Sequence, residues 1–380
     1  MTFSKAALYL PGLFILLLFN FATIAQINIA GKVINEQTGL PIQGASVYFN
    51  NTSIGTNTNA AGQFSLQNSN VVNAELIISC VGYELLVFKP DAATTQNKNF
   101  TFKLAVKEQQ LRDVLILTDA VRKKYLSIFQ NNFLGITEEA IRSTIENRKD
   151  IYFTKGEEKN SFKAYSDTPL VIINKMLGYK ISFELIEFSF EEQSGRTYFF
   201  GYTRYEEMGD KNRWVKNRKR CYYGSTVHFY RSLITNHLKE EGYTMYLIKQ
   251  TPFSIDKGSN VRGENLQNSP NTQQEPAMAV TISAEQIIKP DSSNSSNYNI
   301  TPGGKLMIQY DKDPSSKNYL KDKIMIAGSL PVGFRSYIGV NAPSISLNKT
   351  GIVNNPMDLE YSGYWMYEKA ANMLPFNYEP

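Results

Sequence analysis

The sequence predicts a mainly β protein with a small N-terminal β-sandwich followed by a C-terminal α+β domain that contains antiparallel sheet. Aromatic residues make up 12% of the 380 residues, and their flat rings pack well on pleated surfaces. Residues 27–117 consist of short apolar runs separated by turn signals, which is typical of a sandwich. Helical periodicity occurs only after residue 118, in a few segments between strand patterns.

The first 25 residues have the pattern of a signal peptide. Lys5 precedes an apolar run from Leu8 to Phe21, and Thr23 and Ala25 supply small residues before Gln26. The run is too short for a spanning helix, and no later stretch approaches 18 apolar residues. We therefore expect an exported chain without a transmembrane segment after signal removal, in the periplasm or associated with the outer membrane.

Residues 26–117 contain the strands expected for the sandwich. Turns with glycine separate them, as in Asn59-Ala-Ala-Gly62, because glycine adopts positive φ without strain. The expected strands are Ile29–Ile34, Ala45–Phe49, the segment around Phe64 and Leu66, Leu76–Cys80, Leu85–Phe88 and Phe100–Leu104.

These strands and turns also resemble a known module. The motifs Gly31-Lys-Val33, Gly39-Leu-Pro41-Ile-Gln-Gly44-Ala-Ser-Val47, Ser53-Ile-Gly55-Thr-Asn-Thr58, Gly62-Gln-Phe64 and Ser79-Cys-Val-Gly82-Tyr83 are similar, in order, to the carboxypeptidase-regulatory-like (prealbumin-like) domain. The resemblance implies a seven-stranded prealbumin-like β-sandwich. Such modules accompany some zinc carboxypeptidases and precede the plug of many TonB-dependent receptors. The remaining residues do not provide the strands of a receptor barrel, and the module brings no chemistry of its own.

Residues 118–380 predict the α+β domain. We expect helices from Ala120 to Gln130, from Thr137, from Ser225 towards Gly242, and from Tyr361 to Pro375. Polar composition predicts loops at 257–276 and 290–304. The expected strands are Ile151–Phe153, Phe162–Tyr165, Leu170–Ile173, the hairpin from Tyr179 to Tyr202, Ala279–Ile282, Leu306–Tyr310, Lys323–Ala327 and Ser344–Leu347. Segments such as Leu177-Gly-Tyr179 and Gly363-Tyr-Trp365 resemble an uncharacterised family of exported bacterial proteins.

No catalytic, cofactor-binding or metal-binding site is predicted. His237-Leu-Lys-Glu240 has zinc-ligand spacing, but on one helix His228 would point to the opposite side, and His237 falls on the apolar stripe. Cys221 and His228 lack an orienting acid. Cys80 and Cys221 are expected to be buried thiols, with a disulfide left open. The adjacent Glu pairs, including Glu138-Glu139, are interpreted as solvated charges.

The formal net charge of +5 is concentrated in residues 118–260, where one basic run stands out. It could contact phosphate groups of lipid or lipopolysaccharide. The interpretation that we favour is a solvated helix face whose Trp packs inward, because charge runs usually serve solubility. The candidate binding residues are Arg213, Trp214, Lys216, Arg218, Lys219 and Arg220.

The sequence therefore favours a non-catalytic envelope protein that acts by binding a protein, glycan or lipid partner, alongside outer-membrane transport or assembly. Nucleic acid is not an expected partner of an exported chain. One alternative is a hydrolase, peptidase or glycosidase, whose two carboxyl groups converge only in the fold. Another is glycan or lipopolysaccharide binding through the basic run and Trp214 or Trp365.

Overall fold

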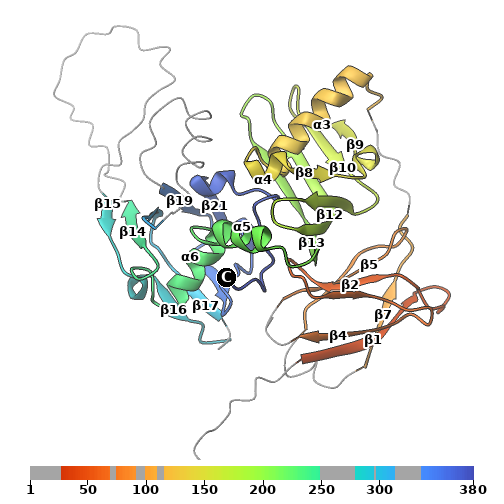
Figure 1. Ribbon diagram of the computed structural model, residues 1–380, viewed down its shortest axis with the longest axis horizontal. Coiled ribbons are helices and arrows are strands. Elements are labelled where there is room, and N and C mark those ends of the chain that lie inside the picture. The colour runs from red at the N-terminus through yellow and green to blue at the C-terminus, as the bar shows by residue number, and fades with distance from the viewer. Residues whose placement is uncertain are drawn as a thin grey trace, which may run out of the picture.

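The computed structural model describes residues 27–68, 74–90, 99–108, 115–248, 279–294, 297–312 and 335–380. The expected signal peptide, the loop 257–276 and the strand Lys323–Ala327 lie outside these residues. The buried side chains form three hydrophobic clusters, one in the N-terminal sandwich and two in the C-terminal part. Figure 1 shows the helices and strands that carry them. None of the helices in the described ranges is long and apolar enough to cross a membrane.

The N-terminal domain is a sandwich of seven strands in two sheets, as expected. One sheet has the order β4 (Gln63–Asn68), β1 (Ile27–Asn35), β7 (Asn99–Leu104). The other has the order β3 (Gly55–Asn57), β2 (Ser46–Phe49), β5 (Leu76–Ser79), β6 (Leu86–Phe88). Strand β7 pairs with β1 in parallel, whereas the other strand pairs of the sandwich are antiparallel.

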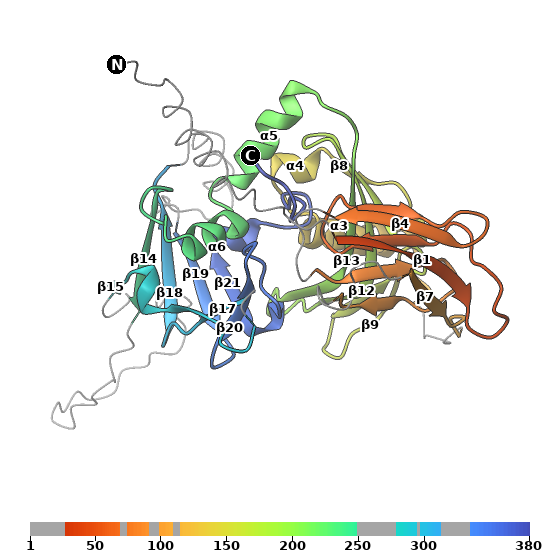
Figure 2. The same ribbon diagram turned by 90° about the horizontal axis from the view of Figure 1, so that it is seen from below.

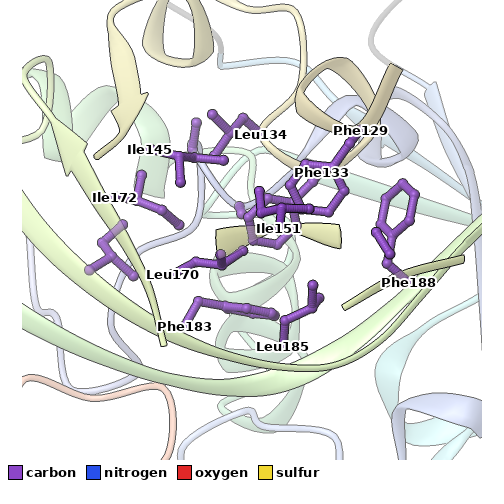
Figure 3. Close-up of a cluster of buried hydrophobic side chains, with 14 of the residues drawn as sticks. Phe129, Phe133, Leu134, Ile145, Ile151, Leu170, Ile172, Phe183, Leu185 and Phe188 are labelled. Atoms are coloured by element: carbon purple, nitrogen blue, oxygen red, sulfur yellow. The ribbon is translucent and has the colours of Figure 1, made fainter. Parts of the chain in front are cut away.

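A six-stranded antiparallel sheet and two helices surround the middle cluster. The sheet has the order β8 (Ser143–Ile145), β11 (Leu170–Asn174), β12 (Tyr179–Phe190), β10 (Phe162–Tyr165), β9 (Tyr152–Lys155), and β13 (Thr197–Glu207) pairs with β12. Helices α3 (Asp119–Phe133) and α4 (Glu138–Ile141) pack on it. Figure 3 shows Phe129 and Phe133 of α3 among buried side chains of the sheet, including Phe183 and Phe188.

The third cluster lies between α6 (Thr226–Ile234) and two antiparallel sheets. The larger sheet has the order β15 (Ala279–Thr281), β14 (Tyr243–Ile248), β18 (Lys305–Tyr310), β19 (Arg335–Val340), β21 (Leu359–Gly363). The smaller has the order β16 (Ile288–Pro290), β17 (Asn297–Ile300), β20 (Ile345–Asn348). Short 3₁₀ turns complete this part: η4 (Ala284–Gln286), η5 (Pro356–Asp358) and η6 (Tyr364–Tyr367), with η3 (Arg148–Asp150) in the middle part.

Three expectations for the C-terminal part are corrected. The segment 290–304, expected as a loop, contains β17, whose Ile300 is buried in the third cluster. The expected terminal helix does not start at Tyr361, because that residue pairs with Ile338 in the sheet. Helix α6 ends at Ile234 rather than near Gly242, since Asn236 has a positive φ of 59° that breaks the helical path.

The N-terminal sandwich is docked on the β12–β13 hairpin through main-chain and side-chain hydrogen bonds. The loop after β2 pairs with β13, since Asn51 N–H donates to Thr203 O (2.7 Å) and Tyr205 N–H donates to Thr52 O (2.9 Å). Beside this pairing, Ser79 Oγ donates to Glu184 Oε1 at 2.6 Å. The sandwich is therefore joined to β13 as a short continuation of its sheet.

Arg204 of β13 fixes the position of the sandwich most directly. Its Nη1 donates to Ser46 Oγ at 2.8 Å and to Asn57 Oδ1 at 2.7 Å. Its side chain runs past Gly55, where an added Cβ would lie 2.8 Å from Arg204 Nε and 2.7 Å from the Cβ of Tyr48. Only glycine leaves room for the guanidinium to reach both partners.

The C-terminal segment connects all three clusters. Ala370 N–H donates to Phe133 O at 3.1 Å, and Phe376 N–H donates to Asn51 O of the sandwich at 2.7 Å. From the third cluster, Arg231 Nη2 donates to Phe376 O, also at 2.7 Å. This segment therefore restricts movement of the three parts against one another.

Replacing Arg204→Ala is expected to loosen the sandwich from the rest of the chain. The change removes two hydrogen bonds from a charged donor and leaves polar groups of Ser46 and Asn57 without that partner, a loss of about 2 kcal/mol. Calorimetry should show an earlier transition for the sandwich in the variant than in the wild type. Arg196→Ala, at an exposed position of the β12–β13 turn, is the control. Identical heat-capacity profiles for all three proteins would contradict this role of Arg204.

Candidate functional site

The predicted basic run forms helix α5 (Asn212–Tyr222), which lies between α4 and α6 (Figures 1 and 2). One side of α5 is anchored to the turn between β11 and β12. Four successive carbonyls of this turn, from Lys175 to Gly178, accept hydrogen bonds from α5 side chains. Such repeated contact to main-chain atoms fixes the rotation of the helix about its axis.

Trp214 and Arg218 make most of this anchor. Trp214 is 4% exposed, and its Nε1–H donates to Lys175 O at 3.0 Å. Its ring lies against Gly178, where a Cβ would approach the indole to 2.2 Å, so the turn requires glycine. Arg218 is 5% exposed and donates to Leu177 O, Gly178 O and Glu207. These two candidate binding residues are therefore structural, which corrects their assignment to a binding face.

Arg220 is partly buried and is also engaged by another part of the chain. Its guanidinium forms an ion pair with Glu139 of α4, which is 6% exposed and also accepts a hydrogen bond from Asn372. The expectation that the Glu138-Glu139 pair is solvated is wrong for Glu139. Its partner lies 81 residues further along the chain, so no local pattern indicates the pair.

The remaining candidate residues lie on the exposed side of α5. Arg213, Lys216 and Lys219 are exposed, and Lys211 precedes the helix. No hydrogen bond or ion pair connects these four cations to an acidic side chain in the part of the chain that the structure describes. Lys211 and Arg213 lie over the outer surface of the Trp214 ring, at 4.7 and 5.7 Å from its centroid. The inward Trp of the favoured interpretation is thus present, with a free basic face above it.

A small hollow lies where α5 ends, with a cavity volume of about 10 Å³, which is room for about one water molecule. Its lining is mostly aromatic, and the only hydroxyl groups in it belong to tyrosines and one serine. Tyr223 is 38% exposed and follows Lys219 by four residues, so the basic face of α5 leads towards this hollow. The lining consists of Tyr223, Gly224, Tyr243, Ile308, Tyr310, Ser336, Tyr364 and Trp365.

Trp365, named as an alternative sugar-binding residue, belongs to the third hydrophobic cluster. It is 4% exposed, and its Nε1–H donates to Gly224 O at 2.8 Å. Trp214 is equally buried, so neither tryptophan offers a free ring for stacking on a sugar. Tyr223 is the exposed aromatic residue beside the basic face. Its place beside the basic run is the sequence signal for it.

His228 lies next to the hollow and is hydrogen-bonded to Tyr243 of its lining. Its Nδ1 accepts hydrogen bonds from Gly224 N–H (3.1 Å) and from the Tyr243 hydroxyl (2.9 Å), so the proton is on Nε2, which donates to Glu241 at 3.1 Å. Burial lowers the pKa of His228, and the hydrogen bond to Glu241 opposes this shift only in part. The ring is neutral and holds Tyr243 in the lining.

The other sequence candidates are separated from this site. His237, expected on a buried stripe, is exposed in the turns after α6. Cys80 and Cys221 are both free, and burial raises the pKa of each thiol, well above its usual range for Cys221. No cluster of three or more potential metal ligands occurs among the residues that the structure describes.

Comparison with known proteins identifies the N-terminal domain. Residues 29–116 match the family model of the CarboxypepD_reg-like domain. No curated protein matches the chain. Among solved structures, a protein of unknown function from Bacteroides fragilis NCTC 9343, provisionally described as membrane-associated, is similar at 10% identity, with a TM-score of 0.17 and coverage of 48% of this chain and 95% of that one.

A 9R-lipoxygenase from Cyanothece PCC8801 is similar at 9% identity, also with a TM-score of 0.17, over 55% of this chain and 48% of the lipoxygenase. At these TM-scores neither likeness supports an argument about this protein. The sandwich, in contrast, is a CarboxypepD_reg-like domain on both its family match and its seven strands.

Acidification is expected to destabilise the protein through His228. A histidine whose pKa is lowered on folding stabilises the fold above its unfolded pKa, near 6.5, and this contribution is lost as the pH falls through the folded value. We expect His228→Gln to be less stable than the wild type at pH 7.5, and the difference to shrink by about 1 kcal/mol or more at pH 5. Denaturant titrations at both pH values measure this. The exposed His237→Gln is the control, and an equal pH response of both variants would refute the role of His228.

Proposed function

We propose, on the premise that residues 29–116 are a CarboxypepD_reg-like domain, that the protein is an exported, non-catalytic binding protein of the bacterial cell envelope. Its ligand is an anionic envelope glycan of the lipopolysaccharide class, which carries phosphate groups on sugar rings. Binding of this kind serves an accessory role beside an outer-membrane transport or assembly machine, in the periplasm or at the outer membrane.

The observation that carries the proposal is the stripe formed by Lys216, Lys219 and Tyr223 on the exposed side of α5. These residues are three and four positions apart, so they lie on one face of the helix and its C-terminal extension. The buried side of α5 holds this face in place through Trp214 and Arg218. The cations therefore meet a ligand in a fixed arrangement.

The residue types fit a phosphorylated sugar. Lysine and arginine cations attract phosphate oxygens, at up to about 1 kcal/mol for each contact at low salt. Tyr223, which is the exposed ring beside this face, provides a surface against which the apolar side of a sugar packs. A phosphate group at the lysines and a sugar ring on Tyr223 are thus bound at neighbouring places.

The hydrolase alternative finds less support in this site. It requires two carboxyl groups about 5–10 Å apart at a cleft. The hollow beside α5 contains no carboxyl group in its lining. Glu139 is engaged by Arg220, and Glu241 is engaged by His228.

The proposal predicts that the exported protein binds purified lipopolysaccharide and that Lys216→Gln/Lys219→Gln weakens this binding by about tenfold at low salt, because two phosphate contacts are lost. Titration calorimetry at 20 and 150 mM salt measures the affinity. A variant with Lys123→Gln and Lys149→Gln carries the same charge change at exposed positions away from α5 and should bind as the wild type does. An equal loss of affinity in both double variants would mean that the attraction is non-specific, which would contradict a binding site on α5.

A second comparison isolates the contribution of the Tyr223 ring. Tyr223→Ser removes the exposed ring and leaves every cation, so the salt-independent part of the affinity should fall while the salt dependence is unchanged. With dephosphorylated lipopolysaccharide, the salt dependence of the affinity should fall while the salt-independent part is retained. Failure of the wild type to bind lipopolysaccharide at either salt concentration would end the proposal.

A further inference from the structure

One edge of strand β13 pairs with β12, and its other edge is hydrogen-bonded over only part of its length. Beyond the long pairing with β12, Thr203 and Tyr205 direct backbone groups towards the sandwich loop at Asn51 and Thr52. Because backbone groups alternate along a strand, Thr197, Phe199 and Gly201 direct theirs to the same edge. In the described ranges, no residue outside β12 is hydrogen-bonded to the backbone of Thr197–Gly201.

This free stretch lacks the features by which proteins protect an edge strand. The sequence Thr197-Tyr-Phe-Phe-Gly201 contains neither a charged residue nor proline, and it has high β-propensity. The irregularity in the β12–β13 pairing lies at Leu185 and Glu187 of β12, so β13 itself stays regular. Gly201 must remain glycine, because a Cβ there would approach Glu184 O to 2.2 Å.

The side chains next to the edge form an exposed apolar patch. Phe200 is 38% exposed and Ile186 of β12 is 44% exposed, although both belong to the ordered sheet. Tyr198 extends the patch, and its hydroxyl lies 3.4 Å from the sulfur of Met357, which is 60% exposed. The patch continues the face of β12–β13 on which the sandwich is docked at Glu184 and Arg204.

We propose that the free edge of β13 pairs with the same edge of a second copy of this chain. An antiparallel arrangement with its two-fold axis at Phe199 places Thr197 opposite Gly201 of the copy. These facing residues would exchange backbone hydrogen bonds across the axis. Between them, Tyr198 lies opposite Phe200 of the copy, in the closely spaced type of pair that favours aromatic side chains.

The edge already accepts a strand-like segment in this way. The sandwich loop uses the backbone of Thr203 and Tyr205, and the second copy would continue the same use over the neighbouring five residues. Tyr198 and Phe200 stand on either side of Phe199, so the two-fold arrangement places an aromatic side chain opposite an aromatic side chain on both sides of the axis. Pairing would join the two six-stranded sheets into one and cover Phe200 and Ile186 of both copies.

The test measures the mass of the protein purified after export, by light scattering and analytical ultracentrifugation over a concentration series. We expect a dimer with a dissociation constant in the micromolar range, because a five-residue strand pair is a small interface. Phe200→Lys should weaken the dimer at least about tenfold, since it places a charge opposite Tyr198. Ile141→Lys makes the same change at an exposed position of α4 and should leave the dimer intact.

Hydrogen exchange locates the contact. At dimeric concentrations the amides of Phe199 and Gly201 should exchange more slowly than in the Phe200→Lys variant, whereas the amide of Tyr205, already bonded to Thr52, should not change. A monomer at every concentration would overturn the proposal. So would a dimer that Phe200→Lys and Ile141→Lys affect equally, or one whose edge amides stay unprotected, because another surface would then hold the copies together.

Discussion

The alternation of side chains along the β12–β13 hairpin is the constraint on which the other contacts depend. Phe183 and Leu185 point to one face and form the middle cluster with α3, whereas Glu184 between them points to the opposite face and meets the sandwich. A shift of the pairing by one residue would exchange these faces and bury Glu184 in the cluster. The turn that leads into β12 also supplies the carbonyls that hold α5. One hairpin thus positions the core, the sandwich and the basic helix.

The β12–β13 hairpin contacts one buried ionisable group towards the sandwich and another towards α5, and the two are compensated in different ways. On the sandwich side, burial raises the pKa of the Glu184 carboxyl, and the hydrogen bond from Ser79 offsets this only in part. On the α5 side, Arg218 remains charged inside the protein because main-chain carbonyls and Glu207 surround its guanidinium. The basic helix therefore carries one buried arginine in its anchor, while Lys216 and Lys219 remain exposed to solvent.

Local patterns predicted most of the strands correctly and failed where distant residues decide. The sandwich strands and the 179–190 strand follow from alternation, which is visible within a few residues. The pattern could not separate Arg218 and Arg220 from Lys216 and Lys219, because the partners of the two arginines are the β11–β12 turn and Glu139, which lie far away in the chain. Tyr361 looks helical beside Tyr364 and Trp365, but pairing with β19 makes it part of a strand.

The hollow beside α5 could not be predicted for the same reason. Its lining comes from the end of α5, three strands and η6, which are up to 142 residues apart in the chain. Only the abundance of tyrosine indicated aromatic surfaces, without saying which rings would be exposed. The choice of Tyr223 over Trp214 and Trp365 follows from packing, since both tryptophans donate their ring N–H to a main-chain carbonyl.

The passage of Arg204 beside Gly55 has a consequence for how such a chain can evolve. A sandwich acquired by recombination from another protein would dock here only if it carried a residue without a side chain at that point and a loop able to pair with β13. Such a module can in principle be joined to many proteins, but the sandwich of this chain is fitted to the contact residues of β13. The sequence of the sandwich and that of β13 are therefore expected to coevolve at these contact positions.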